Sequence, residues 1–155
     1  SDEPCTSADP DLSAFVITGE HETDFTHGAT SAELDSDVQV FRNVSDASRD
    51  FKASATRGLL TCLKTAFAKS LRQSHVPGKV TSAGMGRTPR IGAQAVFYRI
   101  VATISPTNGL PRFRMYADFI AIRKGRSQAS LMFISPLARV QGQLGLMRAV
   151  ARRMR

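Results

Sequence analysis

Three extended segments follow one another in the second half of the chain, with only short turn sequences between them. Residues 93–105 (AQAVFYRIVATIS) are rich in β-branched and aromatic side chains, and residues 113–124 and 127–135 have a similar composition. The pair Asn108-Gly109 between the first two segments is a strong signal for a hairpin turn. Because strands that are joined by short turns pair antiparallel, these segments predict an antiparallel meander.

Alternation within the meander predicts which side chains share a face of the sheet. In the segment 113–124 the positions on one face are Phe113, Met115, Ala117, Phe119 and Ala121. In the segment 127–135 the inward positions are Ala129, Leu131 and Phe133. A sheet with such apolar faces needs other elements to cover it.

Two helices are predicted before the meander and one after it. Ser45 fits the N-cap of a first helix that ends near Ser54. A second helix, from about Thr56 to Arg72, carries an apolar stripe at helical spacing, formed by Leu59, Leu63, Phe67 and Leu71. A final helix spans about 138–154. Together these elements predict an α+β fold, in which a twisted antiparallel β-sheet packs against helices.

The N-terminal quarter of the chain is mostly polar. Residues 1–14 are predicted to form a polar leader, which Pro4 and Pro10 interrupt, and residues 15–155 a single α+β domain. Residues 14–18 (AFVIT) fit a short strand and residues 36–41 (SDVQVF) a second one. Between them the chain is rich in Glu, Asp, Thr, Ser and Gly, which predicts a long surface loop over residues 19–37.

Charge is distributed very unevenly along the sequence. Residues 1–50 hold twelve Asp or Glu and two Arg, a balance of −10, whereas residues 51–155 hold nineteen Lys or Arg and one acid, a balance of +18. The single acid of the second part is Asp118. This asymmetry favours an anionic partner for the basic part or an acidic arm that folds back on it. It also argues against hydrolytic and metal chemistry in the basic part, since such sites need several carboxylates.

Common catalytic and cofactor motifs are incomplete in this sequence. The glycine-rich stretch 84–89 has a proline where a dinucleotide-binding loop needs its third glycine. The sequence has no G-x-S-x-G motif that would supply a serine nucleophile for His75 to activate. His21 and His27 lie in the acidic segment, where a solvated polar loop is favoured over a weak metal site. We therefore predict no catalytic residue, no metal site and no cofactor.

Asp118 allows two interpretations. It lies in the middle of a predicted strand, near Arg99 on the strand that pairs with it. A cross-strand ion pair is the favoured interpretation. In the alternative, Asp118 and Arg99 form the floor of a ligand-binding pocket together with Tyr98 and Tyr116, and an enzyme would use this pocket.

The two cysteines are far apart in sequence, and no C-x-x-C motif is present. Cys5 lies in a polar stretch (SDEPCTSADPD), where a buried thiol is out of place, whereas Cys62 lies beside the apolar stripe of a predicted helix. We predict a disulfide between them, which is typical of an extracytoplasmic protein. Two reduced thiols in a cytosolic protein remain the alternative. No N-terminal signal sequence is recognisable, so an export signal is expected to have been removed.

Cationic side chains are concentrated near the C-terminus. A basic surface is predicted from Arg123, Lys124, Arg126, Arg148, Arg152, Arg153 and Arg155. It would attract an anionic polymer of the cell envelope, a membrane surface or a protein partner. Nucleic acid is the less favoured partner, because the sequence has no RNP-like strand, zinc finger or helix-turn-helix pattern.

The order of these elements resembles a known family. A Cys-bearing leader precedes the segment SDVQVFRN, the Cys-containing helix RGLLTCLKTAF, an antiparallel meander and an Arg-rich closing helix. Over residues 12–154 the chain is similar to small exported lipoproteins and receptor-kinase sensor domains of actinobacteria, which adopt the PsbP/Mog1-like α/β/α sandwich. The residues before Cys5 lack the apolar side chains of a lipid-attachment motif.

The resemblance implies a mostly non-catalytic protein that binds a ligand or partner in the cell envelope. We therefore expect a secreted or envelope-associated binding or sensor domain. The alternatives are an enzyme that uses the pocket around Asp118 and Arg99, and a basic nucleic-acid-binding protein.

Overall fold

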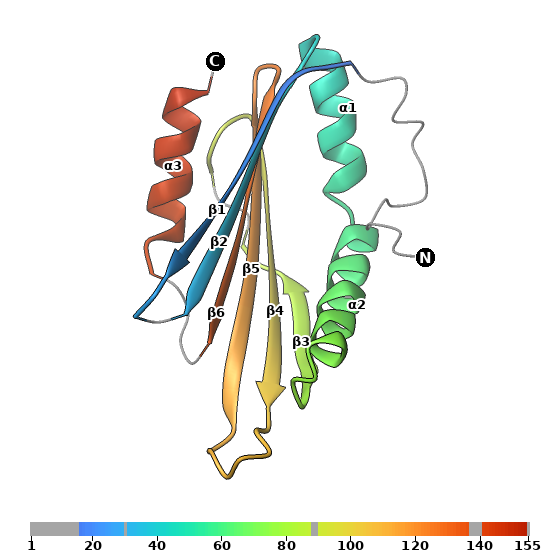
Figure 1. Ribbon diagram of the computed structural model, residues 1–155. Coiled ribbons are helices and arrows are strands. Elements are labelled where there is room, and N and C mark those ends of the chain that lie inside the picture. The colour runs from blue at the N-terminus through green and yellow to red at the C-terminus, as the bar shows by residue number, and fades with distance from the viewer. Residues whose placement is uncertain (1–15, 30, 88–89, 137–140, 155) are drawn as a thin grey trace.

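The computed structural model describes residues 16–29, 31–87, 90–136 and 141–154, and it has an α+β fold (Figure 1). Its strands are β1 (Ile17–His27), β2 (Ala32–Phe41), β3 (Gly78–Met85), β4 (Gln94–Ile104), β5 (Phe113–Lys124) and β6 (Ser127–Pro136). Its helices are α1 (Val44–Ser54), α2 (Arg57–Gln73) and α3 (Gln143–Arg153). All strand pairs are antiparallel, and the strand order in the sheet is β1-β2-β6-β5-β4-β3. The predicted antiparallel sheet with helices is confirmed.

The predicted meander forms the centre of the sheet. Strand β4 pairs with β5 along its whole length, and β5 pairs with β6 through the turn at Gly125. Gly109 lies in the connection between β4 and β5 with φ of 80°, a left-handed conformation that favours glycine. The predicted inward positions of β6 are buried, since Ala129, Leu131 and Phe133 are each at most 5% exposed.

The prediction of a surface loop over residues 19–37 is wrong. These residues form β1 and most of β2, a hairpin whose strands pair from Ile17↔Phe41 to His27↔Ala32. The composition indicated a loop because β1 is an edge strand with nearly every residue exposed, so no apolar alternation is required there. The predicted polar leader, 1–14, lies outside the described residues.

Helix boundaries differ from the prediction at two places. Helix α1 is capped by Asn43, whose side-chain oxygen accepts a hydrogen bond from the Asp46 backbone N–H at 2.8 Å. The predicted cap, Ser45, is therefore wrong by two residues. Helix α2 begins after the Thr56 cap, as predicted. Helix α3 begins at Gln143 rather than near residue 138, and residues 137–140 lie outside the described part.

Helices lie over both faces of the sheet (Figure 1). One face, here called the α1–α2 face, packs Val96, Tyr98 and Phe119 against these two helices. The other, called the α3 face, packs Ile120, Leu131 and their neighbours against α3. Adjacent residues of β5 thus serve opposite cores, as the two-residue repeat of a strand requires. Among the described residues, no helix is long and apolar enough to cross a membrane.

Candidate functional site

An apolar cavity of about 220 Å³ lies on the α1–α2 face, between α2 and the centre of the sheet. It is lined by Leu63, Ala66, Phe67 and Ser70 of α2 and by Tyr98, Ile100, Ala117, Phe119, Met132 and Ile134 of the sheet. Helix α2 lies mainly along β3 at the sheet edge (Figure 1), so on this face it leaves space above β6. Small side chains at Ala66 and Ala117 add to that space. The lining offers dispersion contacts and few hydrogen-bonding groups.

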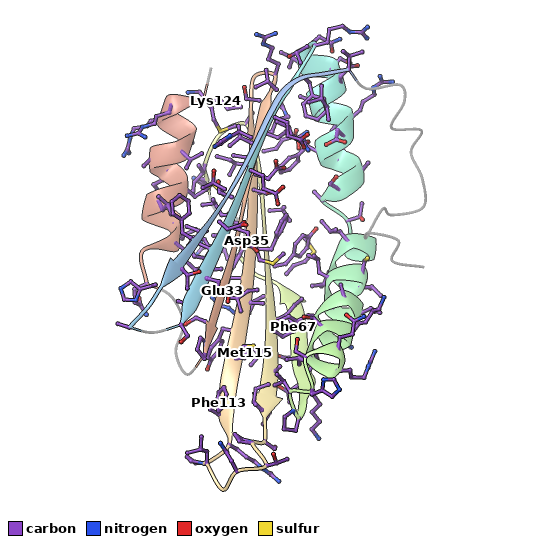
Figure 2. All side chains as sticks on the ribbon, in the orientation of Figure 1. Glu33, Asp35, Phe67, Phe113, Met115 and Lys124 are labelled. Carbon is purple, nitrogen blue, oxygen red and sulfur yellow. The ribbon has the colours of Figure 1, made fainter. Side chains whose placement is uncertain are left out.

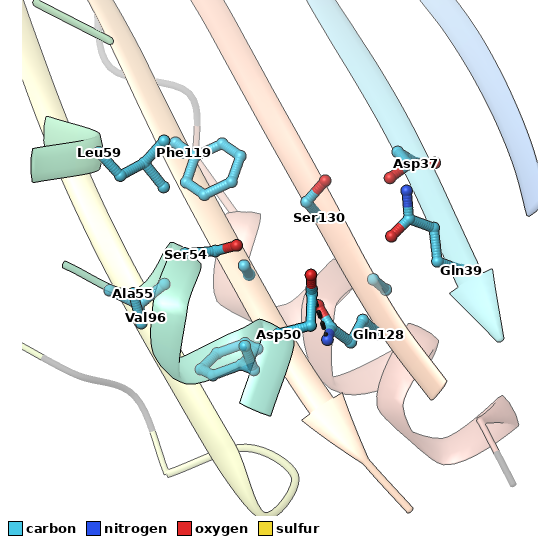
Figure 3. A pocket seen from close by; sticks show the side chains of 13 residues that line it. Asp37, Gln39, Asp50, Ser54, Ala55, Leu59, Val96, Phe119, Gln128 and Ser130 are labelled. Carbon is cyan, nitrogen blue, oxygen red and sulfur yellow. Dashed lines mark hydrogen bonds between the residues drawn. The ribbon is translucent and has the colours of Figure 1, made fainter. Parts of the chain in front are cut away.

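A second cavity, of about 240 Å³, lies beside the first and shares Phe119 with it. Its lining is mixed. Phe51, Ala55, Leu59, Val96, Phe119, Ala121 and Ala129 are apolar, and the polar residues, from β2, α1 and β6, are Asp37, Gln39, Asp50, Ser54, Gln128 and Ser130. Figure 3 shows these groups facing one another across the cavity. Because its lining includes carboxylates, we call this second cavity the polar cavity. The Gln128 amide donates to Asp50 at 3.0 Å and to the Ala47 carbonyl oxygen at 2.8 Å, which holds α1 against β6. We call the two neighbouring cavities the groove.

Six carboxylates of the β1–β2 hairpin lie on the same face as the groove. They are Glu20, Glu22 and Asp24 of β1 and Glu33, Asp35 and Asp37 of β2, at alternating positions of each strand. We call this set the acidic face. Strand β2 joins it directly to the groove, because Glu33 pairs with Ile134, Asp35 with Met132 and Asp37 with Ser130 of β6. Directly opposite residues of an antiparallel pair project to the same face. Figure 2 labels Glu33 and Asp35 on β2 and Phe67 on α2.

Burial and mutual repulsion shift the titration of the carboxylates that border the groove. Burial, Asp24 and Glu33 raise the pKa of Asp35 above its ordinary value. Burial raises the pKa of Asp37 as well, with Glu20 and Glu22 adding to the shift. The pKa of Asp50 is raised by burial and lowered in part by the hydrogen bond from Gln128. Among the side chains that the structure describes, no Lys, Arg or His lines either cavity of the groove.

Asp118 and Arg99 form the predicted cross-strand ion pair. They pair directly between β4 and β5, and the Arg99 Nε and Nη2 atoms donate to the two carboxylate oxygens at 2.6 Å each. The Gln143 side-chain amide of α3 donates to Asp118 Oδ2 at 2.8 Å. Hydrogen bonding to Asp118 raises the pKa of Arg99, against the effect of burial. Asp118, which is 1% exposed, therefore connects the sheet to α3.

The four predicted pocket residues do not share one face of the sheet. Tyr98 lies on the α1–α2 face, where its hydroxyl donates to the Thr56 carbonyl oxygen at 3.0 Å and its ring stacks on Phe119. Arg99 and Asp118 lie on the α3 face, and Tyr116 lies two positions from Asp118, on that face too. Tyr98 lines the apolar cavity, while neither Arg99 nor Asp118 lines the groove.

The predicted basic surface is divided between internal and exposed side chains. Arg123 is buried and donates to Gln94 and to the Gly125 carbonyl oxygen, while Lys124 donates to the Ala151 carbonyl oxygen at the end of α3 at 3.1 Å. The exposed members are Arg126, Arg148, Arg152 and Arg153. Arg155 lies outside the described residues.

The remaining candidates concern cysteine and metal chemistry. Cys62 lies partly buried on α2 and is not a free thiol. Its predicted partner, Cys5, lies outside the described residues, so the disulfide stays a prediction. Within the described ranges no group of three His, Cys, Asp or Glu side chains could hold a metal ion.

Sequence reasoning identified the walls of the groove without identifying the groove. Leu63 and Phe67 belong to the predicted apolar stripe, and Phe119 to the set of residues predicted to share one face of its strand. The acidic face was missed with the β1–β2 hairpin, although the spacing of two between Glu20, Glu22 and Asp24 was visible. In comparisons with known proteins, no family model matches this chain and no curated protein sequence matches it.

Proposed function

We propose that this protein is a non-enzymatic ligand-binding or sensor domain whose ligand lies in the groove. The observation that carries the proposal is the apolar cavity of about 220 Å³ on a helix-covered face, next to a polar cavity of similar size. Ligand sites are typically concave and mostly apolar, with a few polar groups that orient the ligand. The groove has this composition.

A binding role is favoured over a catalytic one by the positions of the charged residues. The enzyme alternative depends on Asp118 and Arg99, and both are held in a bidentate ion pair with a third bond from Gln143. Groups that satisfy each other in this way support the packing of α3 rather than proton transfer to a ligand.

The groove can be tested with an uncharged fluorescent probe, N-phenyl-1-naphthylamine. We expect binding that Ala66→Phe weakens about tenfold, because the new ring occupies the apolar cavity from the α2 side. Thr65→Phe is the matched control, since Thr65 is exposed and its hydroxyl bonds only to its own helix. Absence of probe binding, or an equal effect of both substitutions, would contradict a ligand site in the groove.

The proposed family and compartment rest on different features. Helices on both faces of an antiparallel sheet are compatible with the PsbP/Mog1-like α/β/α sandwich of exported lipoproteins and sensor domains. An extracytoplasmic location is proposed from the predicted disulfide between Cys5 and Cys62. Unfolded protein without reductant should show no reactive thiol, and two should appear after reduction. Two thiols that react before reduction would refute both the disulfide and the argument for the compartment.

The exposed arginines support a second, separate proposal, an anionic partner such as an envelope polymer or membrane surface. The bond from Lys124 to the Ala151 carbonyl oxygen links the β5–β6 turn, which carries Arg126, to the end of α3, which carries Arg152 and Arg153. Vesicles that contain phosphatidylglycerol should bind the protein, and Arg152→Gln/Arg153→Gln should weaken binding about tenfold or more. Arg112→Gln/Arg114→Gln, at the other end of β5, is the control. Binding to nucleic acid but not to vesicles would favour the nucleic-acid alternative.

A further inference from the structure

We infer that the ligand of the groove is a cationic amphiphile, in which an amine or quaternary ammonium group is joined to an apolar chain. The apolar part would lie between α2 and β6, and the cation against the carboxylates of Asp37 and Asp50. This inference rests on the proposed function and specifies the chemistry of its ligand.

The two cavities are arranged in line along β6. Ser130 lines the polar cavity, and Met132 and Ile134, the next residues on the same face, line the apolar one. At roughly 3.3 Å per residue, these three side chains span about 13 Å of strand. The carboxylates Asp37 and Asp50 lie at one end of this line only, so a ligand that follows β6 meets an end with charged groups and an apolar end in a fixed order. An elongated amphiphile matches this order better than a compact polar molecule.

All charged side chains that line the groove in the described part of the chain are acidic. Asp37 and Asp50 line the polar cavity, and Asp35 lies on β2 directly opposite Met132, beside the apolar cavity. The next strand adds Glu22 opposite Asp37 and Asp24 opposite Asp35. Neighbouring strands are about 4.8 Å apart, so these carboxylates repel one another at short range. A cationic group would relieve this repulsion, whereas an anionic group would add to it.

Two of these acids accept hydrogen bonds from neutral amide side chains. Asp50 accepts a hydrogen bond from Gln128, and Gln39 donates to Glu20 at 2.8 Å, but amides leave the negative charge uncompensated. The arginines nearest to the polar end of the groove in sequence, Arg42 before α1 and Arg49 within it, both pair with Asp46. The raised pKa values of Asp35, Asp37 and Asp50 agree with carboxylates that are partly desolvated and lack a compensating cation.

The inference is tested with three amphiphiles that share a decyl chain and differ in the head group. Decyltrimethylammonium, decyl maltoside and decyl sulfate, each below its micelle concentration, compete with N-phenyl-1-naphthylamine for the groove. We expect the ammonium compound to displace the probe at a concentration about tenfold lower than the sulfate. Tetramethylammonium, which has no chain, should not displace it.

Substitutions then assign the preference to the groove carboxylates. Asp37→Asn/Asp50→Asn should abolish the preference for ammonium over sulfate while the uncharged probe still binds. Glu20→Gln removes one charge from the outer strand and should change the preference less than twofold, because solvent and salt screen the more distant group. Thermal unfolding of each variant checks that the fold is retained.

The outcomes separate the inference from the proposed function. If the uncharged probe does not bind, the ligand site itself is refuted. If the probe binds but the sulfate competes as well as the ammonium compound, the groove stands and the cationic ligand is refuted. A preference for ammonium that persists in Asp37→Asn/Asp50→Asn also overturns the inference, since these carboxylates would not confer it.

Discussion

Replacement of Asp118 by alanine tests the account of how α3 is held on the sheet. The carboxylate accepts two hydrogen bonds of 2.6 Å from Arg99 and one of 2.8 Å from Gln143, and it is 1% exposed. Asp118→Ala removes all three bonds. It also leaves the Arg99 guanidinium and the buried Gln143 amide without this acceptor.

The expected loss of stability in Asp118→Ala follows from how deeply Asp118 and Arg99 are buried. Removal of one member of a buried ion pair costs about 3–5 kcal/mol, because the other charge stays behind without its counterion. The Arg99 side chain is 26% exposed and keeps some access to water, which places the loss near the lower limit. We expect Asp118→Ala to lower the free energy of unfolding by about 3 kcal/mol, a large part of the stability of a typical domain.

Urea unfolding followed by far-UV circular dichroism at neutral pH measures this loss. Arg114→Met, an exposed position on the same strand, is the control and should change stability by less than about 0.5 kcal/mol. The double variant Arg99→Met/Asp118→Leu should lose less than the sum of its single variants, because no uncompensated charge remains. A loss below about 1 kcal/mol for Asp118→Ala, or strict additivity in the double variant, would refute this account of the pair.

Three further predictions concern single positions. Tyr98→Phe should lower stability by about 1 kcal/mol in urea unfolding, because it removes the hydroxyl bond to the cap of α2; no change would mean that this bond is replaced by water at no cost. Gly92→Ala should lower the melting temperature and cost about 1–3 kcal/mol of stability, because φ at this position is 66° and a Cβ would lie 2.6 Å from the Arg123 carbonyl oxygen. Gly84→Ala is the control and should be neutral, since a Cβ there meets open space. Equal effects of the two substitutions would contradict the steric argument. Asp37→Asn should stabilise the protein by about 0.5 kcal/mol at neutral pH, because it removes a charge that is partly desolvated by burial and repelled by Glu20 and Glu22 of β1. Burial raises the folded-state pKa of Asp37 above the ordinary 3.8, so the folded protein binds this proton more tightly than the unfolded chain does. The stability of the wild type therefore falls as pH rises from 3.8 through the raised pKa, and the advantage of the variant should vanish below about pH 3.8. An advantage that persists below that pH in pH-dependent unfolding would contradict the electrostatic cause.

The meander was predictable because its pattern is set by local physics. Strands β4, β5 and β6 are covered on both faces, so each alternate residue must suit a core, and Phe119 and Ile120 illustrate the two cores in adjacent positions. The β1–β2 hairpin was not predictable in the same way. Its outer strand is exposed, and Glu22 or Asp24 satisfies an exposed strand as well as a loop.

The groove depended on information that no single segment contains. Leu63, Phe67 and Phe119 were all expected to face a core, and nothing in their spacing indicated that α2 would leave space above β6. A cavity is the difference between the space that the elements enclose and the volume of the side chains that fill it. The pairing of Asp118 with Arg99 was predicted, because strand register alone determines it.

The acidic face also has a consequence for how the chain finds its register during folding. The other side of β2 contributes Leu34 and Val38 to the core beneath α3. A slip of one residue against β6 would exchange the faces of every side chain on β2 and would bury Asp35 and Asp37 beneath that helix. Misaligned pairings would therefore carry a large desolvation penalty. By this penalty the carboxylates of the hairpin favour the native alignment of β2.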